Sequence, residues 1–355
     1  MKINSQLSQR IELLRFVLII GIVFIHIHTG DIQFSGTILM GNVYAMLTEY
    51  LSEGLARVSV PLFFALSGYL YFLNFEASSE NFIKKFKSRF RTLFIPFVIW
   101  NMLIFIFFAI AQNIPVIENY FTGDRPLVLE LEGFENIALF FGFNGFEYPV
   151  AYQFWFIRDL IILVVLTPLI YLFLLKIPYI LLLGLSVMWF FDLNYLEIVR
   201  IDPVSPFFFT LGAYLGMKKY DFSNTDHYAL QILLLYLLIS VVDLFMDSLS
   251  IHHAAIFLGT LAIFSITKYI ITMTKIREYL LSLAKYSFFV YAAHEPFLSI
   301  IRKLTFKAIN PQSDLTIFII YFFSPVITII VCIQLYKILE KVVPKMLNTA
   351  IGGRN

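Results

Sequence analysis

Long apolar segments constrain this chain more than any other feature of its sequence. Ten of them have the hydrophobicity of membrane-spanning segments, and a segment in lipid must satisfy its backbone polar groups internally, as a helix does. The sequence therefore predicts an all-α membrane protein, a polytopic bundle of about ten transmembrane helices. The predicted segments are residues 13–30, 58–75, 92–112, 154–175, 177–193, 204–217, 228–246, 253–273, 286–304 and 315–339.

Composition favours the same class. Hydrophobic residues make up 59% of the chain and charged residues only 14%. No water-soluble domain could bury that much apolar surface, so the bilayer must be the solvent and membrane lipid a partner. The basic residues are spread among short loops, so no nucleic-acid partner is expected. Neither an internal repeat nor a soluble appendage is visible, and residues 1–355 are predicted to form a single integral membrane domain.

The distribution of basic residues predicts the orientation of the chain. If the amino terminus is placed inside, nineteen of the 26 Lys and Arg residues fall on the inner side and seven on the outer side. This asymmetry follows the positive-inside rule, so both termini are predicted to be cytoplasmic. The longest outer segment, residues 113–151, mixes acidic and aromatic side chains. Such a mixture suits a sugar ligand, and a solvated cap that packs its own aromatic rings over the bundle is the alternative.

Ionisable residues on the first predicted helix form the first polar cluster: Arg10, Arg15 and His26. The eleven-residue step from Arg15 to His26 closes to within about 20° of whole helical turns and covers about 16 Å along the axis. Arg15 is therefore expected at the mouth of the bilayer, and His26 on the same face near the middle. An ionisable side chain at that depth indicates a functional site, whereas a histidine bonded to a neighbouring helix is the alternative.

A run of cations before the third predicted span forms the second cluster, in what is expected to be an inner loop. Such a run can simply obey the positive-inside rule or contact anionic lipid. Lys87 and Arg91 are four residues apart in the chain, however, and such a pair on one helix face can hold a phosphate or pyrophosphate. The five cations, which we call the basic segment, are Lys84, Lys85, Lys87, Arg89 and Arg91.

The ninth predicted span contains the third cluster, His294-Glu295-Pro296. His294 lies nine residues beyond Lys285, about 13 Å along a helix, so it too is expected near the middle of the bilayer. Pro296 is expected to kink the helix beside it. A structural His–Glu pair is one interpretation, but two histidines at matching depth on different helices favour a polar site inside the bundle.

Two further groups of charged residues lie near the outer ends of predicted spans: Arg57, and the pair Arg158-Asp159 that follows Trp155. Adjacent residues on a helix point about 100° apart. Arg158 and Asp159 are therefore each expected to bond to another helix rather than to one another. No metal site is predicted, because the neighbouring histidines at positions 252 and 253 lack the i,i+4 spacing of helical metal ligands.

Taken in order, these clusters resemble the acyltransferase-3 family of bacterial integral membrane proteins. The resemblance implies transfer of an acyl group, usually acetyl, from cytoplasmic acyl-CoA to a hydroxyl of a cell-surface polysaccharide, such as an O-antigen or exopolysaccharide, or of its lipid-linked precursor. It also implies a multi-pass protein of the bacterial cytoplasmic (inner) membrane, and here one without the fused esterase-like domain of many relatives. The matching stretches are Arg10–Arg15 with His26, Arg57–Tyr69, Lys87–Pro96 with Trp100, Trp155–Leu160, Leu211–Gly216 and Ser287–Pro296.

The resemblance implies catalytic roles for the ionisable residues of the spans. His26 would be the catalytic base or the acyl carrier, Arg15 would guide the CoA thioester toward it, and Arg10 matches the leading arginine of the family. The expected depth of the ninth span, rather than the resemblance, makes His294 and Glu295 secondary candidates, which would orient His26 or bind the acceptor. Both routes for His26, direct proton removal and an acyl-enzyme with ping-pong kinetics, fit the sequence. The candidates on the acceptor side are Arg57, Trp155, Arg158 and Asp159.

Acyl-CoA is the only cofactor-like molecule that the resemblance implies, and it is a donor substrate whose phosphates the basic segment would bind. Lys87 stands where the family has the first arginine of an R-x-x-x-R motif, Arg91 matches the second, and Arg89 is the substitute for the missing one. A different class of function also fits the buried histidines, namely a transporter or flippase for a polyprenyl-linked sugar with a proton relay. A third possibility is a non-catalytic partner in polysaccharide export. Against the transporter, the sequence shows no inverted repeat and no matched pair of broken helices.

Overall fold

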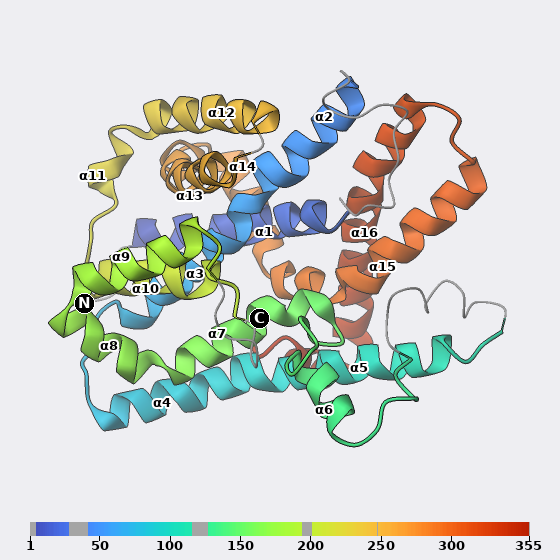
Figure 1. Ribbon diagram of the computed structural model, residues 1–355, viewed down its shortest axis with the longest axis horizontal. Helices are drawn as coiled ribbons and strands as arrows, with labels where there is room; N and C mark the ends of the chain where they lie inside the picture. Colours follow the sequence, from blue (N-terminus) through green and yellow to red (C-terminus); the bar gives the residue numbers. More distant parts are fainter. Residues whose placement is uncertain (1–4, 28–41, 116–126, 194–200, 247, 355) are drawn as a thin grey trace. The chain divides into compact units, whose positions relative to one another are not determined.

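The computed structural model describes residues 5–27, 42–115, 127–193, 201–246 and 248–354 (Figure 1). Within these ranges every regular element is a helix, which confirms the predicted all-α class. The described part of each predicted apolar segment lies mainly on helices. The chain divides into two compact units. Unit 1 comprises Met1–Phe75, Trp189–Phe191 and Phe207–Val342, and unit 2 comprises Glu76–Met188, Asp192–Pro206 and Val343–Asn355.

Helix α1 (Ser5–Ile27) is the centre of unit 1, because it packs against five other helices of that unit. Its core contacts include Leu14 and Leu18 against Leu62 and Leu66 of α3. The remaining elements of unit 1 are α2 (Val43–Glu49), the π-helical turn η2 (Tyr50–Leu55), the 3-10 turn η3 (Ala56–Val58), α3 (Ser59–Phe72), α10 (Val204–Met217, from Phe207 on), α11 (Ser223–Asp226), α12 (Ala229–Phe245), α13 (Leu249–Ile270), α14 (Thr274–Ala284), α15 (Ser287–Ile309) and α16 (Asp314–Val342).

Glycine residues allow α3 and α10 to approach backbone to backbone. A Cβ atom placed on Gly212 would lie 1.9 Å from the carbonyl oxygen of Ala65, and one on Gly68 would lie 2.0 Å from the carbonyl oxygen of Phe209. No side chain fits in such a gap, so only glycine lets these two helices pack this closely. Gly212 and Gly216 belong to one of the stretches that resemble the family, and the structure supplies the physical reason for them.

Unit 2 contains α4, where the sequence predicts a loop, and the structure shows a helix instead. The basic segment lies on α4 and on the π-helical turn that follows it, and residues Ser79–Ala111 form one uninterrupted helical stretch. The Ser78 hydroxyl accepts the Asn81 N–H at the amino terminus of α4, and no glycine or proline interrupts the chain before Pro96. The elements of unit 2 are α4 (Ser79–Arg89), η4 (Phe90–Phe94), α5 (Ile95–Ala111), α6 (Phe134–Phe141), η6 (Tyr152–Phe154), α7 (Trp155–Val165), α8 (Thr167–Lys176), α9 (Pro178–Phe190, to Met188) and α17 (Pro344–Ala350).

Among the described residues, four helical stretches are long and apolar enough to cross a membrane: Val43–Phe72, Ser79–Ala111, Leu249–Ile270 and Asp314–Val342. The helices α7 and α8 are bent by 62° relative to each other, and they make a fifth stretch if the pair is counted as one span. The predicted segment at 154–175 is therefore two helices rather than one.

Proline explains the bend between α7 and α8. Pro168 has no N–H to donate to the carbonyl of Val164, and the Thr167 hydroxyl donates to that carbonyl instead, at 2.7 Å.

Candidate active site

Two histidines from distant parts of the chain meet in unit 1. His26 lies at the end of α1 and His294 in the middle of α15, and their rings stack with centroids 5.2 Å apart and planes 24° apart. His294 is completely buried and His26 is half-buried. The structure thus brings together the two histidines that the sequence singled out, on two helices that pack against each other.

The environment of His294 selects one tautomer of its neutral ring. Its Nδ1 lies 2.7 Å from the carbonyl oxygen of Tyr291 and 3.2 Å from that of Val290. A carbonyl can only accept, so Nδ1 carries the hydrogen and Nε2 presents a lone pair. Nε2 is buried and has no hydrogen-bond partner among the described residues.

The kink that Pro296 predicts in the ninth span is confirmed. The backbone of Glu295 leaves helical geometry, with φ −101° and ψ 132°, immediately before Pro296. The Glu295 carboxylate accepts a hydrogen bond from the Ser299 hydroxyl at 2.9 Å. Glu295 is therefore held by its own helix, next to the histidine pair.

Arg57 lies in the turn between α2 and α3, in the same unit as the histidine pair. Its guanidinium is close enough to His26 to interact with that ring electrostatically. It forms a two-bond ion pair with the carboxylate of Glu53, one turn earlier, and its side chain is exposed. Of the four acceptor-side candidates, Arg57 is the one that belongs to unit 1, the unit that holds the histidine pair.

Helix α1 is held at the level of His26 by a small polar network. The Ser52 hydroxyl donates to the carbonyl of Phe24 at 2.9 Å and shares a 2.6 Å hydrogen bond with the Tyr321 hydroxyl. The Tyr321 hydroxyl also lies 3.2 Å from the carbonyl oxygen of Thr48. Because Phe24 is two residues before His26, the network ties that part of α1 to η2 and α16.

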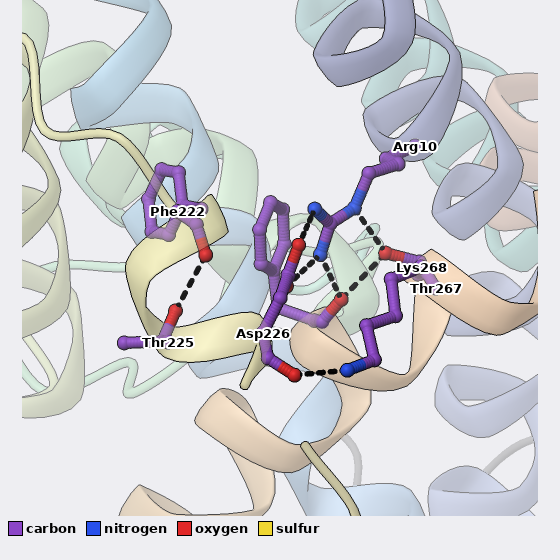
Figure 2. Close-up of polar contacts among 7 residues, drawn as sticks. Arg10, Phe222, Thr225, Asp226, Thr267 and Lys268 are labelled. Atoms are coloured by element: carbon purple, nitrogen blue, oxygen red, sulfur yellow. Dashed lines mark hydrogen bonds and ion pairs between the residues drawn. The ribbon is translucent and has the colours of Figure 1, made fainter. Parts of the chain in front are cut away.

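Arg10 lies at the opposite end of α1, where its guanidinium forms hydrogen bonds with other protein groups (Figure 2). Its guanidinium forms two hydrogen bonds with the Asp226 carboxylate, at 2.7 and 2.8 Å. It also donates to the Thr267 hydroxyl at 2.7 Å and to the carbonyl of Phe264 at 3.1 Å. Sixteen residues of α-helix, about 24 Å, separate Arg10 from His26. The structure therefore places Arg10 in a buried clamp between α1, α11 and α13, and not beside the histidines.

Arg15 differs from Arg10 although both are on α1. Arg15 is exposed, and it makes no ion pair or hydrogen bond with the residues that the structure describes. Because α1 is helical throughout Ser5–Ile27, the predicted separation of about 16 Å from His26 along one face applies. Arg15 is thus a cation available to a ligand.

The basic segment lies in unit 2. Lys84, Lys87 and Arg91 are exposed, and none of the three forms an ion pair with a described carboxylate. Lys85 and Arg89, one turn apart, act on each other as like charges. The α-helical register ends at Arg89, and Arg91 lies in the π-helical turn η4 (Phe90–Phe94). Such turns occur often at functional sites, because they shift side chains out of α-helical phase.

The carboxy-terminal helix packs against the start of α5, a contact that nothing in the sequence signals. The Trp100 indole N–H donates to the carbonyl of Ala350 at 3.0 Å, and Arg354 donates to the carbonyl of Thr92 at 2.6 Å. Gly352 allows this close approach, since a Cβ atom there would lie 2.6 Å from the Thr92 carbonyl oxygen. Thr92 directly follows the basic segment, so α17 supports the helix turn that carries Arg91.

Arg158 and Asp159 form an ion pair with each other at 2.9 Å, so the expectation that they would not pair is wrong. Adjacent residues on a helix point about 100° apart, but the arginine side chain is long enough to bend back to its neighbour. Each also has distant partners, but only Asp159 bonds to another helix as expected, whereas the partners of Arg158 lie in the loop between α6 and η6. Arg158 donates to the carbonyls of Gly142 and Glu147, and Asp159 accepts from the Ser205 hydroxyl at 2.8 Å. This buried network closes the loop before α7, the helix that begins at Trp155.

The adjacent histidines near the start of α13 have separate protein partners. His252 bonds to the carboxylate of Asp243 at 2.8 Å, and the ring of His253 lies against Trp189 with centroids 4.7 Å apart. Within the described ranges, no group of three or more residues of the metal-binding types comes together.

Comparison with known proteins places these residues in context. A family model described as an acyltransferase domain matches residues 8–336. The succinoglycan biosynthesis protein ExoH of Rhizobium meliloti (strain 1021) is 27% identical over 368 aligned residues, which cover 99% of this chain and 94% of that protein. No solved structure matches this chain. The histidine pair and the basic segment lie inside the matched residues, whereas α17 lies outside them.

Proposed function

Since the chain belongs to the acyltransferase-3 family, we propose that it is a membrane-embedded O-acyltransferase that moves an acyl group from cytoplasmic acyl-CoA to a hydroxyl of a cell-surface polysaccharide or its lipid-linked precursor. We propose acetyl as the acyl group that is transferred. The name of ExoH links that relative to the biosynthesis of succinoglycan, and this supports a polysaccharide as the class of acceptor. The acceptor would be an exopolysaccharide or a related surface glycan.

The stacked pair of His26 and His294 is the observation that carries the proposal. A neutral imidazole can take the proton of an attacking hydroxyl, which is worth about 10²- to 10⁴-fold in rate. It can also attack the thioester first and carry the acyl group. We assign one of these two roles to His26. Arg15, exposed on the same helix, would guide the thioester, and Glu295 would help to position the pair.

The donor would be held by the basic segment. The adenosine part of CoA carries a 3′-phosphate and a pyrophosphate, and charge-assisted hydrogen bonds from lysine and arginine hold such groups strongly. Lys84, Lys87 and Arg91 are exposed and free of carboxylate partners in the described structure, so their charge is available to an anion. Lys87 replaces the first arginine of the family motif, and it binds phosphate as a point charge rather than as a planar fork.

The proposal includes a topology. We propose about ten spans within a single membrane domain of the bacterial cytoplasmic membrane, with both termini in the cytoplasm. The basic segment would then face the cytoplasmic pool of acyl-CoA. The loop at 113–151, whose residues 116–126 lie outside the described structure, would face the opposite side and the glycan.

The test of the function is acyl transfer by the purified protein in lipid vesicles. Radiolabelled acetyl-CoA is supplied together with lipid-linked oligosaccharide extracted from a strain that lacks the gene. Label is expected to move to the oligosaccharide. Label that stays in acetyl-CoA, with or without movement of the oligosaccharide across the vesicle membrane, would refute the transferase and support a flippase or a non-catalytic export partner.

The test of the site uses the same assay with His26→Ala. This variant should bind acetyl-CoA as wild type does but lose at least about 10²-fold in transfer rate. Lys341→Ala, which removes an exposed cation far along α16 from the histidine pair, is the control and should retain full activity. Transfer by His26→Ala at close to the wild-type rate would contradict the assignment.

A further inference from the structure

His294 contains a buried hydrogen-bond acceptor that has no partner among the residues that the structure describes. Its Nδ1–H is used by the carbonyls of Tyr291 and Val290, so the ring cannot turn around without losing those bonds. Its Nε2 is a buried atom with no hydrogen-bond partner among the described residues. Buried polar atoms in native proteins almost always have a partner, so each exception requires an explanation.

The neighbourhood of Nε2 narrows the possible partner to a hydroxyl or another neutral donor. The ring lies 5.2 Å, centroid to centroid, from that of His26, and 6.4 Å from that of Tyr291 on its own helix. The nearby carboxylate of Glu295 accepts from Ser299, and the cation Arg57 is paired with Glu53. Burial of a charged donor beside this fully buried ring would cost more than burial of a neutral one, and a carboxylate or phosphate would bring a lone pair toward another lone pair. A hydroxyl supplies the missing O–H and is uncharged.

We infer that His294 Nε2 is the hydrogen-bond acceptor for the reacting hydroxyl of the acceptor sugar, and that the Tyr291 carbonyl sets the tautomer which makes this possible. The inference rests on the proposed acyl transfer to a glycan hydroxyl. It separates the two histidines by role: His294 Nε2 accepts the proton of the attacking hydroxyl, which leaves His26, stacked against it, the role of acyl carrier. Sequence alone could not separate these roles, because it does not show which ring nitrogen is occupied.

Asparagine at position 294 is the sharpest test of the inference. The amide N–H of His294→Asn can replace Nδ1–H toward the Tyr291 carbonyl, but the shorter side chain has no atom at the position of Nε2. Kinetics are measured with radiolabelled acetyl-CoA and the extracted lipid-linked oligosaccharide. The expected result is a loss of at least about 10-fold in kcat/KM for the oligosaccharide, as for the loss of a hydrogen bond, with unchanged affinity for acetyl-CoA. His252→Asn, at a histidine bonded to Asp243, is the matched control and should keep wild-type kinetics.

The outcomes separate the inference from the proposed function. If the wild type transfers acetyl but His294→Asn keeps its kcat/KM for the oligosaccharide, the inference is wrong and the function stands. An equal loss of affinity for acetyl-CoA and oligosaccharide would assign His294 a structural role and also overturn it. If His294→Asn does not fold, His294→Leu is used, because leucine fills much of the volume of the ring and carries no hydrogen-bond acceptor. A lower kcat/KM for the oligosaccharide with unchanged affinity for acetyl-CoA supports the inference in that variant, and wild-type values for both overturn it.

Discussion

Removal of the Asp226 carboxylate should strongly destabilise unit 1, because Asp226 is the counter-charge of the buried Arg10. The two residues are joined by charge-assisted bonds of 2.7 and 2.8 Å, and their side chains are only 16% and 6% exposed. In Asp226→Ala the guanidinium of Arg10 stays buried without its counter-charge, which typically costs about 3–5 kcal/mol. Because Asp226 retains some exposure, water can reach Arg10, and we expect the lower end, about 3 kcal/mol. That is about a 100-fold change in the unfolding equilibrium.

The assay is unfolding by SDS in mixed micelles, followed by tryptophan fluorescence, with Glu340→Ala as the control. Glu340 pairs with Lys285 at 3.8 Å, and their side chains are 45% and 44% exposed, so its loss should cost about 0–1 kcal/mol. A double variant, Arg10→Met with Asp226→Leu, removes both charges and should recover most of the lost stability, because apolar residues of similar volume replace such pairs well. If Asp226→Ala unfolds like the control, or if the double variant is less stable than the single one, the reasoning is wrong.

Three further predictions concern the donor site, the packing of unit 1 and the topology. A variant in which alanine replaces Lys87, Arg89 and Arg91 should bind acetyl-CoA at least about 10-fold more weakly than wild type, whereas Lys341→Ala should bind it as wild type does. Isothermal titration measures both affinities, and equal affinity in the two variants would reject the site. Gly212→Leu should prevent folding or cost more than about 3 kcal/mol, because Ala65 leaves no room for a side chain, whereas Gly184→Leu, at a position with open space around it, should melt like wild type. A cysteine at Glu132 should react with an impermeant thiol reagent added outside intact cells and one at Ser79 should not, the native Cys332 being buried; the reverse pattern would overturn the orientation.

The helical class and the positions of the helices follow from local information, and the sequence predicted them well. Apolar residues over a span-length segment favour a helix whatever the rest of the chain does, because the segment must satisfy its own backbone. The prediction failed where the local signal was mixed. The basic segment was expected to be a loop because of its charge, yet apolar residues such as Phe82 and Phe86 share its helix with the cations. At Pro168, the bend between α7 and α8 depends on a single missing N–H.

The candidate site was only partly predictable. The expected depths of His26 and His294 in the bilayer were derived from the constant rise per residue of a helix, and both residues were identified in that way. Which helices are neighbours does not follow from the rise, because it depends on complementary surfaces such as the Gly212 contact with Ala65. The two histidines were therefore predicted as members of one site, while their stacking at 5.2 Å was not.

The partners of the buried charges also needed the tertiary structure. Arg10 and Asp226 are 216 residues apart in the chain, and nothing in either segment indicates the other. Arg10 was expected in the catalytic cluster, yet the structure uses its guanidinium to hold α1 against α11 and α13.

By itself, then, the sequence determined which segments are helices and how far apart the ionisable residues of one helix lie along its axis, because both depend on residues close together in the chain. Only the tertiary structure decided which side chains meet, which nitrogen of His294 has a partner among the described residues, and which of two arginines on one helix forms a buried ion pair. Those properties depend on contacts between segments far apart in the chain, and such contacts are selected by the shape and charge of both surfaces together.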